Sequence, residues 1–501
     1  PTGALGAISG KESPRLAGLF AQRWRSIVSS MLEGCRAMRP KVLLVNPPIH
    51  DFSAYDFWLK PYGLLRVAGY LRGQADLHLF DYLDRHHPLS PVDARRRSDQ
   101  WERGPFYASR LPQPPLFADI PRRYRRYGLP RQHFQEFLSA AGPFDAALIQ
   151  TVMTYWYPGV KEVIDDIRTL SPHTTIVVGG VYATLCPQHA RGLGADVVIE
   201  RSDLEPLWQL LRTAPQVDEL PLWEAYDDLR LGILKLADGC PFRCTYCSVP
   251  QVYPPFASRP LARSVAELDW LCQRGVQHIA FYDDALLFQP DRILMPFLRH
   301  VLARQLQVHF HTPNALNARF ITREIAELMV QAGFKTFYLG FESSAYAWQR
   351  RTGSKVYAEE LEQAVAHLVR AGADVRHITA YLIMGHPHGA QQDVEASMHF
   401  AHRLGLRLML SEFSPIPGTP DGEYCRQWVD LDEPLWHNKT VFPLRFLGVE
   451  SVGRLKTLCR ELNGSLGRAD LAGPDGGGAR GVAADSGGRA AASANPTALS
   501  P

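Results

Sequence analysis

The chain has 501 residues, of which 46% are hydrophobic and 21% charged, a composition typical of globular proteins and sufficient for two or three domains. Its formal net charge of +3 favours neither nucleic acid nor an anionic membrane surface as a partner. No apolar run reaches the ~18 to 20 residues of a membrane-spanning helix. The basic run at 122–127 indicates a solvated face, or a face that packs on a neighbouring subdomain, rather than an RNA-binding patch.

Residues 41–213 are predicted to form a doubly wound parallel sheet. In this range, apolar runs alternate with segments of helical periodicity. A leader at 1–40 precedes it, and we expect this leader to be poorly ordered. Residues 87–130 are rich in Pro and Arg, lack a period and indicate an insertion. Five β/α steps indicate a Rossmann-like α/β domain. The predicted strands are 42–45, 77–80, 146–150, 175–178 and 197–200, and the predicted helices are 64–71, 132–140, 160–170 and 206–211.

A second β/α series is predicted for residues 232–420, after a proline-containing linker at 214–231. Residues 421–464 then form a C-terminal extension, and the Gly-, Ala- and Ser-rich tail at 465–501 is expected to be disordered. The predicted strands of the second series are 233–236, 278–282, 308–311, 336–339, 378–383 and 407–410, and its helices are 265–272, 292–304, 323–332, 359–369 and 393–404.

The segment Asp238-Gly-Cys-Pro-Phe-Arg-Cys-Thr-Tyr-Cys247 places three thiols at Cys240, Cys244 and Cys247. Three soft ligands at this spacing indicate an incomplete metal site, because a closed structural site uses four, and three thiolates on a four-iron cluster leave one iron open. The alternatives are small buried residues on one helix face, which the neighbouring Gly and Pro oppose, and a zinc site with a distant fourth ligand. The other cysteines are scattered, which does not suit a disulfide framework and predicts a reducing, cytoplasmic location.

The spacing Cys-x3-Cys-x2-Cys, with Tyr246 just before the last cysteine, resembles the signature of the radical S-adenosylmethionine (SAM) enzymes. The resemblance implies that the three cysteines hold a [4Fe-4S] cluster whose free iron chelates the methionyl amine and carboxylate of SAM. It also implies that an electron, supplied by a donor such as flavodoxin or ferredoxin, cleaves SAM to a 5'-deoxyadenosyl radical. The six β/α repeats fit the partial (β/α)6 TIM-like barrel of that family.

The resemblance further implies that residues at the strand ends bind SAM, since a parallel barrel binds ligands at the carboxyl ends of its strands. An Asp-Asp pair follows the second strand, a Gly-x-Glu-Ser motif ends the fourth, and a glycine after the fifth resembles the Gly-x-Pro element beneath adenine. The Pro-Gly-Thr-Pro stretch at 417–420 matches the same subgroup. A helix N-cap for the second Asp and a surface position for the Glu are the alternatives. The SAM-binding candidates are Tyr246, Asp283, Asp284, Glu342, Ser343 and Gly385.

The order of elements over residues 41–213 resembles the cobalamin-binding domain that precedes the barrel in one radical SAM subgroup. The mutase-type Asp-x-His-x-x-Gly motif is absent, so cobalamin would be bound without histidine ligation or with another group as its ligand. His50 is a candidate ligand, although a lone loop histidine is more often exposed. A Gly-Gly pair after a strand is equally a packing feature. By position, the cobalamin-binding candidates are Asn46, Thr151, Met153, Gly179 and Gly180.

We therefore predict a cobalamin-dependent radical SAM methyltransferase that acts on an unactivated carbon of a small molecule or peptide. One alternative is a radical SAM rearrangement or ring-forming oxidoreductase that uses no corrinoid. Another is a non-catalytic iron-sulfur or zinc-binding protein. The sequence identifies neither the substrate nor a catalytic acid or base.

Overall fold

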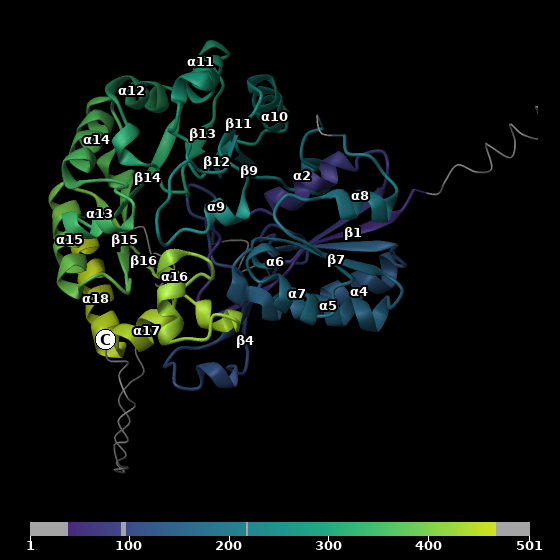
Figure 1. The fold of residues 1–501 in the computed structure, drawn as a ribbon. Helices are drawn as coiled ribbons and strands as arrows, with labels where there is room; N and C mark the ends of the chain where they lie inside the picture. The colour runs from purple at the N-terminus through teal and green to yellow at the C-terminus, as the bar shows by residue number, and fades with distance from the viewer. Residues whose placement is uncertain (1–38, 92–96, 217–218, 467–501) are drawn as a thin grey trace, which may run out of the picture.

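The computed structural model describes residues 39–91, 97–216 and 219–466, and Figure 1 shows two parallel sheets beside each other. The first sheet has five strands in the order β3-β1-β6-β7-β8, which confirms the predicted doubly wound sheet. Nearly all of the predicted leader, and all but the first two residues of the predicted tail, lie outside the described residues. The strands are β1 (Lys41–Asn46), β3 (Asp76–Asp81), β6 (Ala146–Thr151), β7 (Thr175–Gly180) and β8 (Val197–Ile199).

Helices cover both faces of this sheet, because alternate residues of its strands are buried on opposite sides. Val42 and Leu44 pack with α2 and α8 on one face, whereas Leu43 and Val45 pack with α4 and α5 on the other (Figure 1). The helices of this domain are α2 (Tyr62–Tyr70), α4 (Arg131–Ala141), α5 (Tyr157–Leu170), α6 (Val181–Leu185), α7 (Pro187–Gly192) and α8 (Glu205–Leu211).

The segment between β3 and α4, predicted as an insertion without periodicity, contains regular structure. β2 (Ile49–Asp51), β5 (Arg125–Tyr127) and β4 (Ala108–Arg110) form an antiparallel sheet in that order. Strands of three residues are too short to show a readable alternation in the sequence. Arg126 of the basic run is buried and pairs with Glu162 of α5 at 2.8 Å, so this part of the run packs on a helix of the same domain.

In the described part of the linker at 214–231, residues 214–216 are exposed, whereas residues 221–223 and 226 are buried. The linker contains η3 (Trp223–Ala225), and Trp223 is fully buried. The indole nitrogen of Trp223 donates a hydrogen bond to Glu267 of the barrel at 3.0 Å. Tyr226 donates to Asp81 at the end of β3 at 2.6 Å. The linker therefore fixes one domain against the other.

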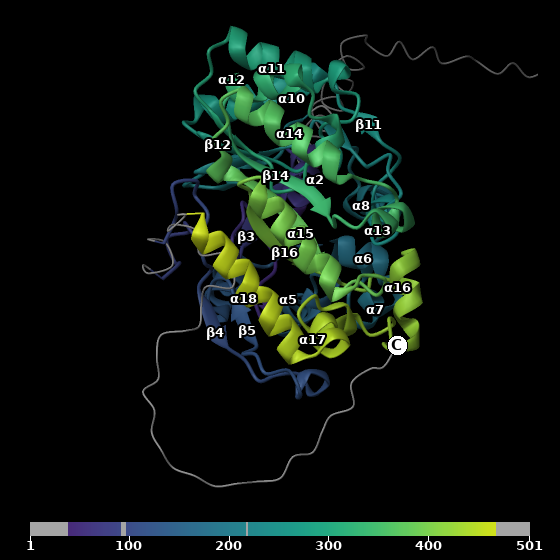
Figure 2. The same cartoon turned by 90° about the vertical axis from the view of Figure 1, so that its left-hand side faces the viewer.

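The second sheet has six parallel strands in the order β16-β15-β14-β13-β12-β9, which confirms the partial barrel. Its strands are β9 (Leu231–Leu234), β12 (His278–Phe281), β13 (His309–His311), β14 (Phe334–Glu342), β15 (Ile378–Met384) and β16 (Arg407–Glu412). Helices cover its outer side, as Figure 2 shows for α12, α14 and α15. The helices of the barrel are α10 (Leu261–Gln273), α11 (Leu294–Ala303), α12 (Arg323–Gln331), α13 (Tyr346–Thr352), α14 (Ala358–Arg370) and α15 (Gln391–Arg403).

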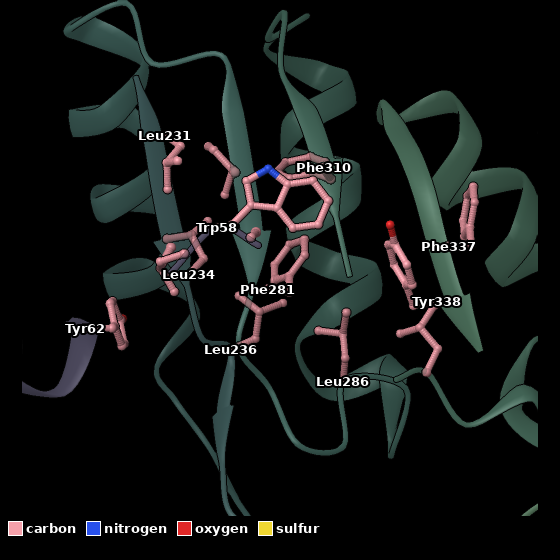
Figure 3. Close-up of a cluster of buried hydrophobic side chains, with 14 of the residues drawn as sticks. Trp58, Tyr62, Leu231, Leu234, Leu236, Phe281, Leu286, Phe310, Phe337 and Tyr338 are labelled. Carbon is pink, nitrogen blue, oxygen red and sulfur yellow. The ribbon is translucent and has the colours of Figure 1, made fainter. Parts of the chain in front are cut away.

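Side chains from the first domain fill one end of the barrel, and we call Trp58, Trp101 and Arg103 the plug. Trp58 is fully buried and stacks on His311 of β13 with ring centroids 4.4 Å apart. Figure 3 shows Trp58 among aromatic side chains of the barrel strands. Trp101 contacts the rings of His278 and His309, which begin β12 and β13. The plug thus closes the amino end of the barrel, opposite the end that binds ligands.

The C-terminal extension is folded against both domains. It contains α16 (Pro420–Tyr424), η8 (Pro434–His437), α17 (Val441–Leu447) and α18 (Val449–Ser465). Asn463 of α18 accepts from and donates to the backbone of Leu408 in β16 at 2.8 and 2.9 Å, so α18 covers the edge strand of the barrel (Figure 2). None of the helices in the described ranges has the length and apolar character needed to cross a membrane.

Candidate active site

The three candidate cluster cysteines lie in one loop that follows β9, at the carboxyl end of the barrel strands. The loop leaves β10 (Ala237–Asp238), which pairs with β11 (Ala257–Ser258), and leads into α9 (Val249–Val252). No helix covers residues 240–247, so the helix-face alternative for the cysteines is wrong. Gly239 has φ +75°, and a Cβ there would lie 2.2 Å from the carbonyl oxygen of Pro254, so only glycine fits this turn.

All three thiols are free and partly buried. Burial raises their pKa values, that of Cys247 to about 12, while the nearby Lys355 lowers them. Iron binding would stabilise the thiolates, because a metal ion offsets the cost of burying their charge. Among the described residues, no group of three or more His, Cys, Asp or Glu side chains is arranged so that it could hold a single metal ion. Three soft donors in one loop fit a cluster that has three cysteine ligands.

Asp283 binds the backbone of its own barrel. Its carboxylate accepts hydrogen bonds from the N–H groups of Leu236 and Ala237 at 2.7 to 3.1 Å. Burial raises the pKa of the Asp283 carboxyl to about 7. These bonds tie the end of β12 to the segment that enters the cysteine loop, so the geometry makes Asp283 a support of that loop. Its contact with SAM stays a prediction.

Asp284 keeps one carboxylate oxygen without a hydrogen bond. No helix begins after Asp284, so the N-cap alternative is wrong. The ammonium of Lys235 lies 3.6 Å from Oδ2, and within the described residues that buried oxygen has no hydrogen-bond partner. Burial raises the pKa of Asp284, and Lys235 opposes this shift. A buried acceptor without a partner is costly, so this carboxylate is suited to receive a ligand's ammonium group.

Glu342 is held in an uncommon backbone conformation at the end of β14. Its φ is +65°, and the register between β14 and β15 shifts at this point. Such strain in a residue other than glycine concentrates at functional sites. The side chain is buried, so the surface alternative is wrong, and its carboxylate accepts from Lys355 at 2.8 Å. A Cβ at Gly340 would lie 2.5 Å from the Lys355 ammonium, so this glycine makes room for the pair.

The other three SAM candidates make contacts within the protein. Ser343 accepts through Oγ from the backbone N–H two residues further along at 3.1 Å. Tyr246 stacks on Trp348 with ring centroids 5.9 Å apart. Gly385 has φ +82°, and a Cβ there would lie 2.7 Å from Pro443 of α17, so the close approach of α17 accounts for this glycine. SAM binding by these three residues stays a prediction.

A chain of hydrogen bonds, which we call the latch, connects the cysteine loop to the C-terminal extension. Thr245 donates through Oγ1 to Asp421 of α16 at 2.5 Å, and the backbone N–H of Asp421 donates to the carbonyl of Thr245 at 3.1 Å. His386 Nε2 lies 2.9 Å from the same carboxylate, and its Nδ1 accepts from Trp348 at 3.2 Å. The Pro-Gly-Thr-Pro stretch leads directly into α16 and so positions Asp421. Sequence reasoning missed Asp421, because a single acidic residue in a short helix carries no signature.

The cobalamin candidates lie at the carboxyl edge of the first sheet. Asn46 donates to the carboxylate at the end of β3 at 2.7 Å, and Thr151 donates to the carbonyl of Gly179 at 2.9 Å. Gly180 has φ +110°, and a Cβ there would lie 2.3 Å from the carbonyl oxygen of Thr151. Met153 differs from these residues because its side chain is 43% exposed. Packing therefore accounts for Gly180, and corrinoid binding by all five candidates stays a prediction.

His50 is buried and paired, so the expectation of an exposed loop histidine is wrong. Its Nε2 lies 3.3 Å from Glu162, and its side chain is only 10% exposed. The next residue, Asp51, is fully buried and accepts from the side chains of Trp156 and Asn438 at 2.9 Å each. The bond to Asn438 ties β2 of the small antiparallel sheet to the C-terminal extension, a link that the sequence did not reveal.

The cysteine loop and the edge of the first sheet lie close together. α6 begins directly after Gly180 and contacts α9, which directly follows the cysteine loop, and Figure 1 draws these helices side by side. Two surface hollows of about 620 and 410 Å³ lie elsewhere, one between α4 and α5 and one beside the β4–β5 pair. The chemistry-bearing residues are therefore concentrated where the two domains meet.

Comparison with known proteins identifies the barrel. Residues 234–401 match the family model described as the radical SAM superfamily. The chain is 26% identical over 216 residues to an uncharacterised methyltransferase of Pyrococcus horikoshii, covering 42% of this chain and 46% of that protein. It is 29% identical over 196 residues to the ribosomal protein uS12 methylthiotransferase RimO of Chlorobium phaeovibrioides, covering 37% and 45%. The chain thus matches less than half the length of these curated relatives.

Solved structures share the arrangement of two domains. The radical SAM methyltransferase TsrM from Kitasatospora setae has a TM-score of 0.60 at 15% identity, covering 84% of this chain and 89% of that one. The cobalamin-dependent SAM radical enzyme OxsB has a TM-score of 0.50 at 14% identity, covering 87% and 62%. At these identities the likeness concerns the fold. The barrel, over residues 234–401, thus matches the radical SAM superfamily, and the fold of both domains is similar to that of TsrM. A doubly wound parallel sheet that precedes a partial barrel is the fold that this chain shares with these two structures.

Proposed function

We propose that this protein is a cobalamin-dependent radical SAM methyltransferase that methylates an unactivated carbon of a small molecule or peptide. The observation that carries the proposal is the contact between α6 and α9, which sets the edge of the first sheet against the cysteine loop. A corrinoid at that edge would lie next to a SAM molecule at the cluster. The likeness of the fold to TsrM and OxsB supports this assignment.

The residues at the carboxyl end of the barrel would bind and orient SAM. A [4Fe-4S] cluster on the three cysteines of the loop would supply the electron for SAM cleavage. Asp284 and Glu342 would receive the methionyl amine, since one has a buried oxygen without a partner and the other is held in place by Lys355. Asp283 and the latch would hold the loop from opposite sides.

The first domain would hold the corrinoid, which supplies the methyl group when bound. His50 is occupied by Glu162, so we expect cobalamin without histidine ligation. Electron paramagnetic resonance of the cob(II)alamin form should then show no nitrogen splitting from an axial base. Clear nitrogen splitting that disappears in His50→Ala would overturn this part of the proposal.

Anaerobic reconstitution with iron, sulfide and hydroxocobalamin tests the whole proposal. We expect about one four-iron cluster and one corrinoid per chain, formation of 5'-deoxyadenosine on reduction, and transfer of label from methyl-labelled SAM to substrate. The packing roles of Thr151 and Gly180 favour a second candidate, because they require no corrinoid. A chain that cleaves SAM but retains no corrinoid would identify that candidate, a rearrangement or ring-forming oxidoreductase.

A further inference from the structure

The surface beside the cysteine loop is basic, and we call Arg243, Arg350 and Arg351 the arginine rim. Arg243 immediately precedes Cys244, and the other two arginines lie near the end of α13; all three are exposed. Arg351 donates to Nε2 of His388 at 3.0 Å. Within the described ranges, no Asp or Glu oxygen lies within 4.0 Å of these guanidinium groups. The rim therefore presents positive charge that no carboxylate of the described chain neutralises.

The rim is in direct contact with the backbone that carries the cluster ligands. α13 ends at Gly353, where a Cβ would lie 3.1 Å from Cα of Cys244 and 3.3 Å from the carbonyl oxygen of Arg243. The backbone N–H of Thr245 donates to the carbonyl of Thr352 at 3.2 Å. The end of α13 and the cysteine loop are thus packed together, so a protein bound at the rim would lie close to the cluster.

Like charges gathered on one surface attract a partner of opposite charge and speed its association. A radical SAM enzyme requires one electron for each cleavage, and that electron has to reach the cluster from a reductant. The rim combines the two properties that such a reductant needs in its docking site, positive charge and closeness to Cys244.

We propose that the arginine rim is the docking surface for a small acidic protein that carries low-potential single electrons, of the flavodoxin type. On docking, one electron leaves the reduced flavin of the carrier and one electron enters the oxidised cluster. No bond is made or broken at the rim. This inference rests on the cluster of the proposed function and adds a partner site that is independent of the corrinoid and the substrate.

Two double charge reversals test the proposal. Arg350→Glu with Arg351→Glu changes the rim. Arg122→Glu with Arg123→Glu makes the same change in charge beside β5, where both arginines are exposed and line a surface hollow. Figures 1 and 2 show α13 and the β4–β5 region on different parts of the molecule. Iron content and circular dichroism establish that each reconstituted variant is folded and loaded.

The experiment measures the rate of cluster reduction, which is monitored as the loss of visible absorbance. The protein is mixed with reduced bacterial flavodoxin and, in a separate experiment, with photoreduced deazaflavin. The rim reversal should slow reduction by flavodoxin about 10-fold or more at low ionic strength, and added salt should lessen the difference. The reversal beside β5 should leave this rate unchanged. Deazaflavin, a small reductant that needs no docking surface, should reduce both variants as fast as the wild type.

An unchanged flavodoxin rate in the rim variant overturns the proposal. An equal loss in the variant beside β5, or an equal loss with deazaflavin, overturns it as well, since the effect would then not belong to docking at the rim. A wild-type chain that holds no cluster, or whose cluster deazaflavin does not reduce, overturns the proposed function instead.

Discussion

The two ends of the barrel bury different kinds of side chain. At the plugged end they include aromatic and imidazole rings: His311 lies between the Trp58 ring and the hydroxyl of Thr336, 3.0 Å from its Nδ1. At the carboxyl end, Asp284 has a buried oxygen without a hydrogen bond and Glu342 has a strained backbone. Neither property is confined to this end, because Trp58 also has a positive φ and Nε1 of Trp101 also lacks a hydrogen-bond partner among the described residues. What distinguishes the carboxyl end is that it gathers thiols and buried carboxylates, the groups that bind metals and cations. The comparison teaches that one end of the barrel provides stability and the other provides chemistry.

Among the predictions for the carboxyl end, removing the three thiols should have the largest effect. In the variant with Cys240, Cys244 and Cys247 changed to Ala, anaerobic reconstitution should yield no bound iron, because the other cysteines are scattered. Circular dichroism should match the wild type, since the plug is intact. Iron retained by this variant, or about eight irons per chain in the wild type, would contradict the assignment of one four-iron cluster to this loop.

The substitution Trp58→Ala removes a fully buried side chain of the plug. The free energy of unfolding should fall by about 3 to 5 kcal/mol, the usual cost of deleting a fully buried large aromatic side chain. Urea unfolding of the wild type and the variant measures it. Trp270→Ala, at a partly buried position, is the matched control and should cost less. A stable Trp58→Ala variant that has lost SAM binding would show that the plug belongs to the active site.

The substitution Glu342→Ala removes a carboxylate from the carboxyl end of the barrel and leaves the three cysteines in place. SAM binding to the reconstituted protein should weaken by about 1 to 3 kcal/mol, the scale of a lost charge-assisted hydrogen bond. Anaerobic calorimetry measures this affinity, and Glu359→Ala, an exposed position on α14, is the control. Equal SAM affinity in the wild type and in Glu342→Ala would mean that Glu342 only supports Lys355.

At the plugged end, His311 should make the free energy of unfolding depend on pH. Burial, together with His278 and Arg103, holds the pKa of His311 well below its usual 6.5. The unfolded chain therefore binds a proton below about pH 6.5 where the native chain does not, so stability falls as pH falls, by up to about 1.4 kcal/mol per pH unit. His311→Gln should flatten this slope in urea unfolding at about pH 6.5 and pH 5. A slope equal to that of the wild type would assign the pH dependence to other groups.

Sequence patterns were sufficient where the structure is periodic or local. Strands such as β1, β6 and β9 are buried apolar runs, which is why they could be read from the sequence. The cysteine loop was equally readable, because its three thiols lie within eight residues. By contrast, Thr245 and Asp421 are 176 residues apart and meet only in the folded protein.

The neighbours Asp283 and Asp284 show a second limit. They are identical in the sequence, yet one carboxylate bonds to backbone N–H groups and the other keeps a free oxygen. Which oxygen is occupied depends on where β9 and Lys235 lie in space. Lys355 was missed for the same reason, since its role depends on the space above Gly340.

The tethers provided by the C-terminal extension set an order for the maturation of the enzyme. Asn438 bonds to Asp51 across 387 residues, and Asp421 holds the cysteine loop. Because synthesis proceeds from the amino end, Asp51 and the cysteine loop leave the ribosome before either tether exists. The latch can therefore fix the cysteine loop only after α16 has been synthesised. A nascent or truncated chain that ends before residue 420 would carry every cysteine of the loop and still lack its latch.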